Sequence, residues 1–327
     1  MSYPLHNVLV TGGAGFIGAN FIRHLLAQET NVRVINLDLL TYAGSLDNLV
    51  NLPHPDRYHF IHGNICDAVL VKNLLRDHNV DTIVHFAAES HVDRSIQDPG
   101  AFIQTNLVGT FTLLEAARQY WKNNTGRFHH VSTDEVFGTL QKNDPAFTEQ
   151  TKYAPNSPYS ASKAGSDHLV RAYFHTYKLP VTTSHCSNNY GPYQHAEKLI
   201  PTIIHACLAQ KPIPIYGNGS NIRDWLYVED HCRGIMTILK NGQLGETYNI
   251  GGCNEWNNLK LAQYICQVMD ELRPQKKSYK ELITFVTDRP GHDWRYAIDC
   301  TRMRNELNWQ PLETFETGIR KTIEFYL

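Results

Sequence analysis

A tyrosine and a lysine lie four residues apart in the segment Tyr159-Ser160-Ala161-Ser162-Lys163. On a helix this spacing places both side chains on one face, one turn apart. An ammonium group beside a phenol favours the phenolate and lowers the pKa of the tyrosine from about 10 toward neutral pH. Such a phenolate can take a proton from a carbinol during hydride transfer. The same spacing is common on surface helices, so the pair alone does not define a site.

Two adjacent carboxyl groups, Asp134 and Glu135, follow Thr133 at the end of a predicted strand at 127–132. We expect these three side chains to point into the crevice beyond that strand. A simple alcohol oxidation needs only a hydroxyl-bearing residue, a tyrosine and a lysine, so two further carboxyls indicate additional proton transfers. One can act as an acid and the other as a base if their surroundings separate their pKa values. An acidic loop in solvent is the alternative interpretation.

A third motif, Thr11-Gly12-Gly13-Ala14-Gly15-Phe16-Ile17-Gly18, joins the first predicted strand to a helix. Glycines here permit a tight turn and a close approach of the backbone to a pyrophosphate, which the amides of the helix N-terminus favour. Asp38 lies twenty residues after Gly18, at the end of the second predicted strand. A carboxylate there accepts hydrogen bonds from ribose hydroxyls and repels a 2′-phosphate. The sequence therefore predicts a site for NAD rather than NADP.

Short apolar segments alternate with amphipathic ones through the first half of the chain. Strands are predicted at 8–11, 32–37, 59–62, 82–87, 127–132 and 181–186, and long helices at 99–122 and 157–177. The alternation predicts an α/β fold with a Rossmann-type doubly wound parallel sheet. After about residue 190 the segments are shorter. We therefore expect an NAD-binding domain at 1–190 and a smaller α/β domain that binds substrate at 191–327, with some chain returning to the first sheet.

The composition excludes several classes of partner. Thirty basic and 32 acidic side chains give a net charge of −2, without the basic excess typical of nucleic-acid-binding domains. No apolar run approaches the roughly 20 residues of a membrane span. The seven cysteines form no CxxC pair, and the 17 histidines form no HExxH motif. We expect a cytoplasmic protein without a metal ion, in which the adjacent His129 and His130 are core or edge residues.

Together these motifs resemble the dTDP-glucose 4,6-dehydratases, a family of extended short-chain dehydrogenases/reductases. The resemblance runs nearly end to end and includes residues 11–18, 87–96, 132–138, 159–163, 186–192, 223–231 and 288–293. The glycine turn and the Tyr159–Lys163 spacing mark only the superfamily. Thr133-Asp134-Glu135 together with Arg289-Pro290-Gly291-His292 is specific to the dehydratases.

The resemblance implies a redox-neutral elimination on dTDP-glucose. Tyr159, helped by Lys163 and Thr133, would take the proton of the glucose 4-hydroxyl while hydride passes to NAD. Glu135 would remove the C5 proton as Asp134 protonates the departing 6-hydroxyl, and the hydride would return to C6. The products would be dTDP-4-keto-6-deoxyglucose and water, in the biosynthesis of rhamnose-type deoxysugars.

The resemblance also implies ligand contacts and a homodimer formed through the helices at 99–122 and 157–177. The residues implied for NAD are Gly12, Gly15, Phe16, Ile17, Gly18, Asp38, Leu39, Leu40, Thr41, Asn64, Ile65, Phe86, Ala87, Ala88, Ser90, Thr105, Tyr159, Lys163 and Asn189. Those implied for the nucleotide sugar are Ser90, Thr133, Asn188, Lys198, Leu199, Pro214, Tyr216, Arg223, Asn258, Arg289 and His292. The chain departs from the family pattern at Asn64, Phe137, His195, Ala196 and Trp294.

Two other functions share part of this pattern. A nucleotide-sugar 4-epimerase or decarboxylase has the glycine turn, Tyr159 and Lys163, but lacks the carboxyl pair at 134–135. A non-catalytic NAD-binding scaffold on the same fold would lack Tyr159 or Lys163, and both are present.

Overall fold

The computed structural model describes residues 2–122, 125–288 and 292–327. Its largest element is a seven-stranded parallel sheet in the order β10-β6-β5-β4-β1-β2-β3. The strands are β1 (Asn7–Thr11), β2 (Arg33–Asp38), β3 (Tyr58–His62), β4 (Thr82–His85), β5 (Arg127–Thr133), β6 (Val181–Cys186) and β10 (Thr247–Ile250). The predicted doubly wound sheet is confirmed. The chain reverses its direction of winding between β1 and β4, where such sheets bind ligands.

The six strands predicted in the first half are all present, with boundaries shifted by at most two residues. Their side chains alternate between two cores. Val8 and Val10 contribute to the core beneath one face, while Leu9 contributes to the core beneath the other. His129 and His130, neighbours on β5, are both fully buried, so the prediction of core histidines is confirmed.

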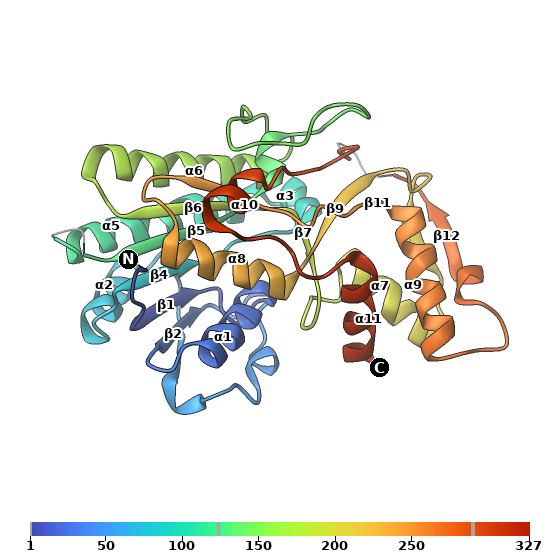
Figure 1. The fold of residues 1–327 in the computed structure, drawn as a ribbon, viewed down its shortest axis with the longest axis horizontal. Coiled ribbons are helices and arrows are strands. Elements are labelled where there is room, and N and C mark those ends of the chain that lie inside the picture. The colour runs from blue at the N-terminus through green and yellow to red at the C-terminus, as the bar shows by residue number, and fades with distance from the viewer. Residues whose placement is uncertain (1, 123–124, 289–291) are drawn as a thin grey trace.

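Helices cover both faces of the sheet (Figure 1). One face carries α1 (Phe16–Gln28) and α8 (Val228–Asn241), and the other carries α2 (Ala68–Asp77), α5 (Thr110–Tyr120) and α6 (Pro158–Tyr177). Ser157 caps α6 in a capping box with Ser160, and Pro158 occupies the first turn. Because α8 and β10 come from the second half of the chain, that half supplies part of the first core.

The helix predicted at 99–122 is not one continuous α-helix. It divides into α4 (Pro99–Phe102), a π-helical stretch (Ile103–Gly109) and α5. Within the wider turn, the Asn106 amide accepts from the Glu89 N–H at 2.9 Å and donates to Ser162 Oγ at 2.8 Å. These bonds tie the stretch to the segment after β4 and to α6. Periodicity alone could not distinguish this geometry from an α-helix.

A second group of elements lies at the right of Figure 1, around a core that contains Ile203, Ile265 and Phe315. Its strands form a three-stranded sheet, β11-β9-β7, and a two-stranded parallel sheet, β12-β8. The elements are β7 (Asn188–Tyr190), β8 (Ile213–Tyr216), β9 (Ile222–Tyr227), β11 (Glu255–Asn257), β12 (Ile283–Val286), α7 (Leu199–Ala209), α9 (Asn258–Leu272) and α11 (Phe315–Tyr326).

The remaining elements are short. They are α3 (Val92–Gln97), α10 (Thr301–Leu307) and 3₁₀ turns at Leu46–Leu49, Pro55–Arg57, Asp134–Phe137 and Tyr279–Leu282. Within the described ranges, no helix combines the length and apolar character needed to cross a bilayer.

Candidate active site

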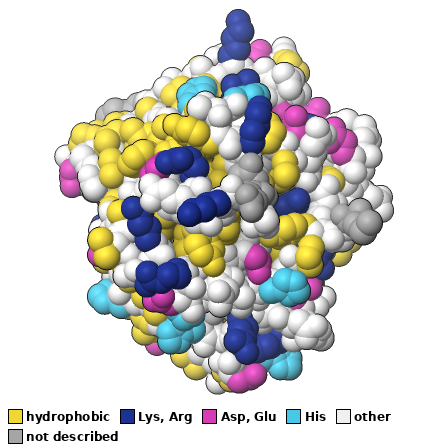
Figure 2. All heavy atoms as spheres, turned by 90° about the vertical axis from the view of Figure 1, so that its left-hand side faces the viewer, with side chains coloured by type: hydrophobic (Ala, Val, Ile, Leu, Met, Phe, Trp, Pro, Cys, Tyr) yellow, Lys and Arg dark blue, Asp and Glu magenta, His cyan; other side chains and the backbone are white. Residues whose placement is uncertain are grey.

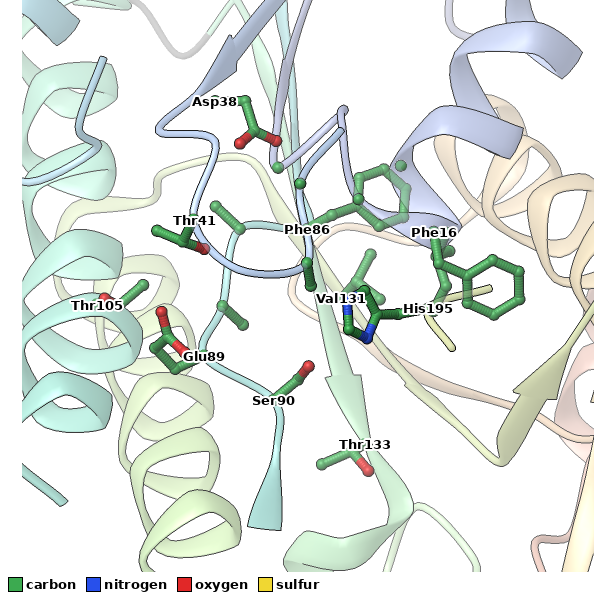
Figure 3. Close-up of a pocket in the computed structure, with 18 of the residues that line it drawn as sticks. Phe16, Asp38, Thr41, Phe86, Glu89, Ser90, Thr105, Val131, Thr133 and His195 are labelled. Atoms are coloured by element: carbon green, nitrogen blue, oxygen red, sulfur yellow. The ribbon is translucent and has the colours of Figure 1, made fainter. Parts of the chain in front are cut away.

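A cavity of about 320 Å³ lies beyond the carboxyl ends of β1 to β6. Figure 3 shows Asp38 at one end of it and Thr133 at the other, with Ser90 between them. The residues predicted for the cofactor or for catalysis that line it are Gly12, Gly15, Phe16, Ile17, Gly18, Asp38, Leu39, Thr41, Asn64, Ile65, Phe86, Ala87, Ala88, Ser90, Thr105, Thr133, Glu135, Tyr159, Lys163 and Asn189. Sequence segments far apart in the chain therefore meet at one site.

The glycine turn leaves room for a ligand backed by main-chain amides. Gly12 has a φ of +72°, and a Cβ added there would lie 2.6 Å from the Ala87 backbone. Gly15 is the N-cap of α1 and has no side-chain capping bond. A Cβ on Gly15 would meet only the Gly12 carbonyl oxygen, at 3.3 Å, and would otherwise occupy the open cradle. These features fit a pyrophosphate at the start of α1.

Asp38 is held in place by its own backbone surroundings. Its two carboxylate oxygens accept hydrogen bonds from the Ala14 N–H at 2.9 Å and the Leu40 N–H at 2.8 Å. Burial raises the pKa of Asp38, and these two bonds oppose that rise. Leu40, a predicted cofactor residue, lies outside the cavity lining, and its N–H donates to Asp38.

Tyr159 and Lys163 both reach the cavity, but the predicted fall in the tyrosine pKa is wrong for this structure. Burial raises the pKa of Tyr159 well above its ordinary value, and the charge of Glu135 adds to the rise. A side-chain hydrogen bond with Thr133 opposes it. The Lys163 ammonium donates to the Val131 carbonyl oxygen at 2.9 Å. Sequence spacing placed the pair on one face but could not include the burial of the phenol or the second partner of the ammonium.

The two neighbouring carboxyls have different surroundings. Glu135 lines the cavity, whereas Asp134 is 2% exposed and lies beneath it. Burial raises the pKa of Asp134 well above its ordinary value, and the nearby charges of Glu135 and Asp224 raise it further. These surroundings therefore favour the protonated form of Asp134. Its Oδ2 has no hydrogen-bond partner among the described residues. The predicted division of the pair into an acid and a base has a structural basis here.

Asp134 should lower the stability of the fold as the pH rises. Its pKa is raised in the folded state, so the unfolded chain gives up this proton at lower pH than the folded chain does. Compared with wild type, Asp134→Asn should have nearly the same free energy of unfolding at pH 4. At pH 8 we expect the variant to be more stable, by about 1.4 kcal/mol for each unit by which folding raises the pKa of Asp134. Denaturant titrations at both pH values measure this difference. The exposed Asp56→Asn is the control, and a pH-independent difference for Asp134→Asn would contradict the assignment.

The residues predicted for the nucleotide sugar fall into two groups. Ser90, Thr133, Asn188 and Lys198 line the cavity. The second group lies outside the cavity lining, on β8, on β9 and at the starts of α7 and α9. It comprises Leu199, Pro214, Tyr216, Arg223 and Asn258, together with His292, which lies shortly before Arg295. Arg289 lies outside the described residues.

The surroundings of Arg223 and of two asparagines bear on ligand binding. The Arg223 guanidinium lies 4.3 Å from the Tyr296 ring centre and donates to the Asp293 carbonyl oxygen at 3.0 Å. Its charge also lowers the pKa of Asp134 in part, so β9 and the carboxyl pair are electrostatically connected. Asn188 Oδ1 and Asn258 Oδ1 are buried without a hydrogen-bond partner among the described residues. Such acceptors fit a ligand that supplies the missing donors.

The cavity lining includes residues to which no role was assigned from the sequence, namely Tyr42, Glu89, Cys186, Gln194 and Glu197. Cys186 ends β6 and Glu89 follows β4, so their place at strand ends was a usable signal. Tyr42 and Glu197 belong to a cluster at the cavity edge, in which the Arg94 guanidinium lies 3.8 Å from the Tyr42 ring centre. That cluster joins loops distant in sequence, and no local pattern reveals it.

The departures from the family pattern are accommodated locally. The Asn64 amide oxygen accepts from the Cys66 N–H at 2.9 Å at the cavity edge. Phe137 is buried, with its ring centre 4.9 Å from that of His185. His195 lines the cavity and meets the Tyr42 ring edge-on. Ala196 offers its carbonyl oxygen to the Thr202 hydroxyl, and Trp294 accepts from the Ile222 N–H through its backbone.

Comparison with known proteins places this architecture in a family. The family model described as GDP-mannose 4,6 dehydratase matches residues 9–322. A dTDP-glucose 4,6-dehydratase of Shigella flexneri is 56% identical over 334 residues, which span 98% of this chain and 92% of the relative.

Solved structures extend the comparison. The dTDP-glucose 4,6-dehydratase DesIV of Streptomyces venezuelae, crystallised with NAD and TYD bound, matches with a TM-score of 0.90 at 46% identity, over 98% of this chain and 96% of that one. A UDP-glucose 4-epimerase of Thermotoga maritima, with UDP-glucose, has a TM-score of 0.87 at 26% identity over 98% of both chains. The fold of this chain is thus nearly equally similar to that of the dehydratase and to that of the epimerase. Sequence identity, rather than the fold, distinguishes the two relatives. The chain belongs to the dTDP-glucose 4,6-dehydratase family.

Proposed function

We propose that this chain is an NAD-dependent hydro-lyase that converts dTDP-glucose to dTDP-4-keto-6-deoxyglucose and water. One observation carries the proposal beyond family membership. Tyr159 and Lys163 share their site with two adjacent carboxyls, of which Asp134 is buried with a raised pKa while Glu135 lines the cavity. A 4-epimerase has no use for such a pair, because it removes no proton from C5 and expels no water.

The residues around the cavity fit NAD. The cradle at Gly15 suits the pyrophosphate, and Asp38 suits an unphosphorylated ribose. NAD, when bound, supplies the acceptor and donor of the hydride. Because the hydride returns within each turnover, the reaction needs no net supply of reduced cofactor.

Gly15→Ala tests this cradle. The φ of Gly15 is −77°, which alanine adopts readily, so we expect the variant to fold with a small change in melting temperature. Its added methyl group projects into the cradle, and we expect the affinity for NAD to fall at least about 10-fold, since each 1.4 kcal/mol of lost binding is tenfold. Calorimetric titration of NAD into apo-protein measures the affinity. Unchanged affinity would remove Gly15 from the site.

Three side chains share the first proton transfer in this proposal. Tyr159 takes the proton of the glucose 4-hydroxyl, and Thr133 stabilises the phenolate through its hydroxyl. The Lys163 ammonium favours the same charge state once it turns from the Val131 carbonyl oxygen toward the phenol. The result is a 4-ketone, which acidifies the adjacent C5–H bond.

The carboxyls then carry out the elimination. Glu135, which lines the cavity, takes the C5 proton, and the electrons of the broken C5–H bond form the C5–C6 double bond. Asp134, whose raised pKa favours its protonated form, gives its proton to the departing 6-hydroxyl, so that water leaves. When the hydride reaches C6, Glu135 returns a proton to C5. Glu135 is then restored. Tyr159 still holds the proton taken from the 4-hydroxyl and Asp134 lacks the one it gave to water, so Tyr159 must release one proton to solvent and Asp134 must regain one before the next turnover.

Substrate contacts follow from the two groups of residues. Ser90 and Thr133 would bond the hexose, and Arg223 would bind the diphosphate together with Arg289. The other contacts we propose are Asn188, Lys198, Leu199, Pro214, Tyr216, Asn258 and His292. We also propose the division into an NAD-binding domain at 1–190 and a nucleotide-sugar domain at 191–327, with α8 and β10 returning to the first sheet. Since NAD and nucleotide sugars are intracellular metabolites, we place the reaction in the cytoplasm.

The direct test offers dTDP-, UDP-, CDP- and GDP-glucose separately to the purified enzyme. We expect the 4-keto-6-deoxy product from dTDP-glucose, with kcat/KM at least about 10-fold above that for the other bases. Equal efficiency with all four would overturn the assignment of the base and leave the chemistry standing.

We further propose a homodimer through the outer faces of α5 and α6. Figure 2 views the molecule from the side on which the C-terminal ends of these helices lie, and it shows hydrophobic side chains gathered among lysines and arginines. Ile103, Phe111 and Tyr177 are 46–47% exposed, although they lie in or beside these helices. Large exposed apolar side chains in one region are typical of an interface.

Phe111→Glu should convert the dimer to a monomer, because a charge at a buried apolar contact costs several kcal/mol. Sedimentation velocity at about 10 µM measures the state. Leu312→Glu is the matched control, since Leu312 is 71% exposed in the segment before α11 and should leave the dimer intact. A dimeric Phe111→Glu protein would place the interface elsewhere.

A further inference from the structure

A cluster of buried polar side chains lies behind the catalytic end of β5, and the reaction described above makes no use of it. At its centre is Asp167, one helical turn after Lys163 on α6, with a side chain that is 3% exposed. Its Oδ2 accepts from Ser132 Oγ at 3.0 Å and from Tyr153 Oη at 3.1 Å, and lies 2.9 Å from His185 Nε2. Its Oδ1 lies 3.1 Å from His130 Nε2. Burial of this kind favours the neutral form of a carboxyl group, so a charged Asp167 requires partners that stabilise the anion.

Asp167 stays an anion because its partners stabilise the charge. Burial alone would raise its pKa, but the side chains of His130 and His185 hold the pKa well below its usual range. Burial, with the charge of Lys163 adding to it, lowers the pKa of His130 to about 4, so His130 is neutral at pH 7. The cluster thus holds a negative charge without a histidinium ion on His130 to neutralise it.

The buried ammonium of Lys163 is the countercharge. Burial lowers the pKa of Lys163, and the negative charge of Asp167 opposes that fall. The other titratable groups that face Lys163 are Tyr159 on α6, His85 on β4, His130 on β5 and Cys186 on β6. Burial lowers the pKa of His85 and raises that of Cys186 to about 12, so both are neutral. Among these groups, all within the described residues, Asp167 is the carboxylate that keeps the ammonium charged.

The same residues link α6 to β5 through two hydrogen bonds. Lys163 Nζ donates to the Val131 carbonyl oxygen at 2.9 Å, and the next residue, Ser132, donates to Asp167 at 3.0 Å. Lys163 and Asp167 lie at i and i+4 on α6, facing the same way. Ser132 directly precedes Thr133 and the carboxyl pair, so these two hydrogen bonds fix the strand end that carries them.

We propose that Asp167 is a positioning residue of this reaction, which holds Lys163 as an ammonium against β5 and fixes the strand end that bears Thr133, Asp134 and Glu135. The inference rests on the proposed function, because Lys163 matters through Tyr159. A purely structural role for Asp167 would change stability without changing the pH at which Lys163 loses its proton. The two roles can therefore be separated by a pH profile.

The test compares Asp167→Asn with wild type, measuring kcat at saturating dTDP-glucose from pH 6 to pH 10. Removing an opposite charge near a buried group shifts its pKa by about 1–3 units. We expect the alkaline limb of the variant to move to lower pH by about one unit or more, with kcat at pH 7.5 reduced about 10- to 100-fold. Asp167→Glu retains the anion and should keep the wild-type limb, even if its extra methylene lowers kcat.

Two further variants keep the test decisive. Tyr153→Phe removes one hydrogen bond to Asp167 but leaves the charge, so its alkaline limb should coincide with that of wild type. Asp167→Ser, a smaller neutral replacement that leaves space for water, carries the same expectation as asparagine if the latter does not fold. An alkaline limb unchanged in a folded neutral variant would overturn the inference. Failure of the wild-type enzyme itself to form the 4-keto-6-deoxy sugar would instead overturn the proposed function.

Discussion

Tyr159→Phe is expected to lower kcat for product formation by about 10³-fold, within the range of 10²–10⁴ typical of a lost acid–base group. The phenol is the group that we assign to the 4-hydroxyl proton, and phenylalanine keeps its shape while removing the proton acceptor. The ring of Tyr159 meets that of Phe102 edge-on, with 6.3 Å between ring centres, and this contact survives the substitution. The fold should therefore persist.

The measurement is the steady-state rate of 4-keto-6-deoxy sugar formation, with NAD affinity measured in parallel. We expect NAD to bind the variant with near wild-type affinity, because the glycine turn and Asp38 are unaltered. Tyr120→Phe, at the end of α5 and outside the cavity lining, is the control and should retain full activity. If kcat of Tyr159→Phe falls by less than about 10-fold, a residue other than Tyr159 takes the proton of the 4-hydroxyl.

Glu135→Gln is expected to separate the two halves of the reaction. The amide cannot accept the C5 proton, so water loss should slow by about 10²–10³-fold, while oxidation at C4 still proceeds through Tyr159. In a single turnover with enzyme in excess, absorbance at the wavelength of reduced cofactor should rise and then persist. In the wild type the same signal should be transient.

The charge of Glu135 also affects the pKa values of its neighbours, so Glu135→Gln should change a second measurable property, the pH dependence of the oxidation step. The carboxylate raises the pKa values of Tyr159 and Asp134. Its removal should therefore move the pH dependence of the oxidation step to lower pH, because Tyr159 then ionises more easily. An unchanged rate of dehydration in Glu135→Gln would remove Glu135 from its assigned role.

The sequence was most informative where local pattern determines structure. The apolar strands, the glycine turn and the capped helix at α6 follow from residue type and spacing, and they bring Tyr159, Thr133 and Asp38 to one cavity. The carboxyl ends of parallel strands lie at one edge of the sheet, so residues that follow them can be assigned to a common site from the sequence.

Other features depended on tertiary surroundings. The π-helical stretch at Ile103–Gly109 is fixed by Asn106 bonds to Glu89 and Ser162, both remote in sequence. The pKa of Tyr159 rises because strands and loops from the whole fold bury the phenol, which no spacing rule contains. The second partner of Lys163, the Val131 carbonyl oxygen, is likewise a consequence of how α6 packs on β5.

The carboxyl pair was predicted in part from the sequence, and the rest depended on the tertiary structure. Adjacent positions in the sequence indicated two proton-transferring groups, and only the family resemblance assigned Asp134 as the acid and Glu135 as the base. Their separation came from the turn after β5, which buries Asp134 and leaves Glu135 at the cavity. Two residues that are chemically almost identical thereby acquire different surroundings, and those of Asp134 raise its pKa.

The central claim is that oxidation, water loss and reduction occur on one sugar without net change in the cofactor. The most direct measurement incubates the purified enzyme with dTDP-glucose and no added reductant, and follows product by NMR and reduced cofactor by absorbance. We predict quantitative conversion to dTDP-4-keto-6-deoxyglucose, with many turnovers for each bound NAD and no net accumulation of reduced cofactor. Stoichiometric reduced cofactor, or a C4 epimer as the sole product, would contradict the account.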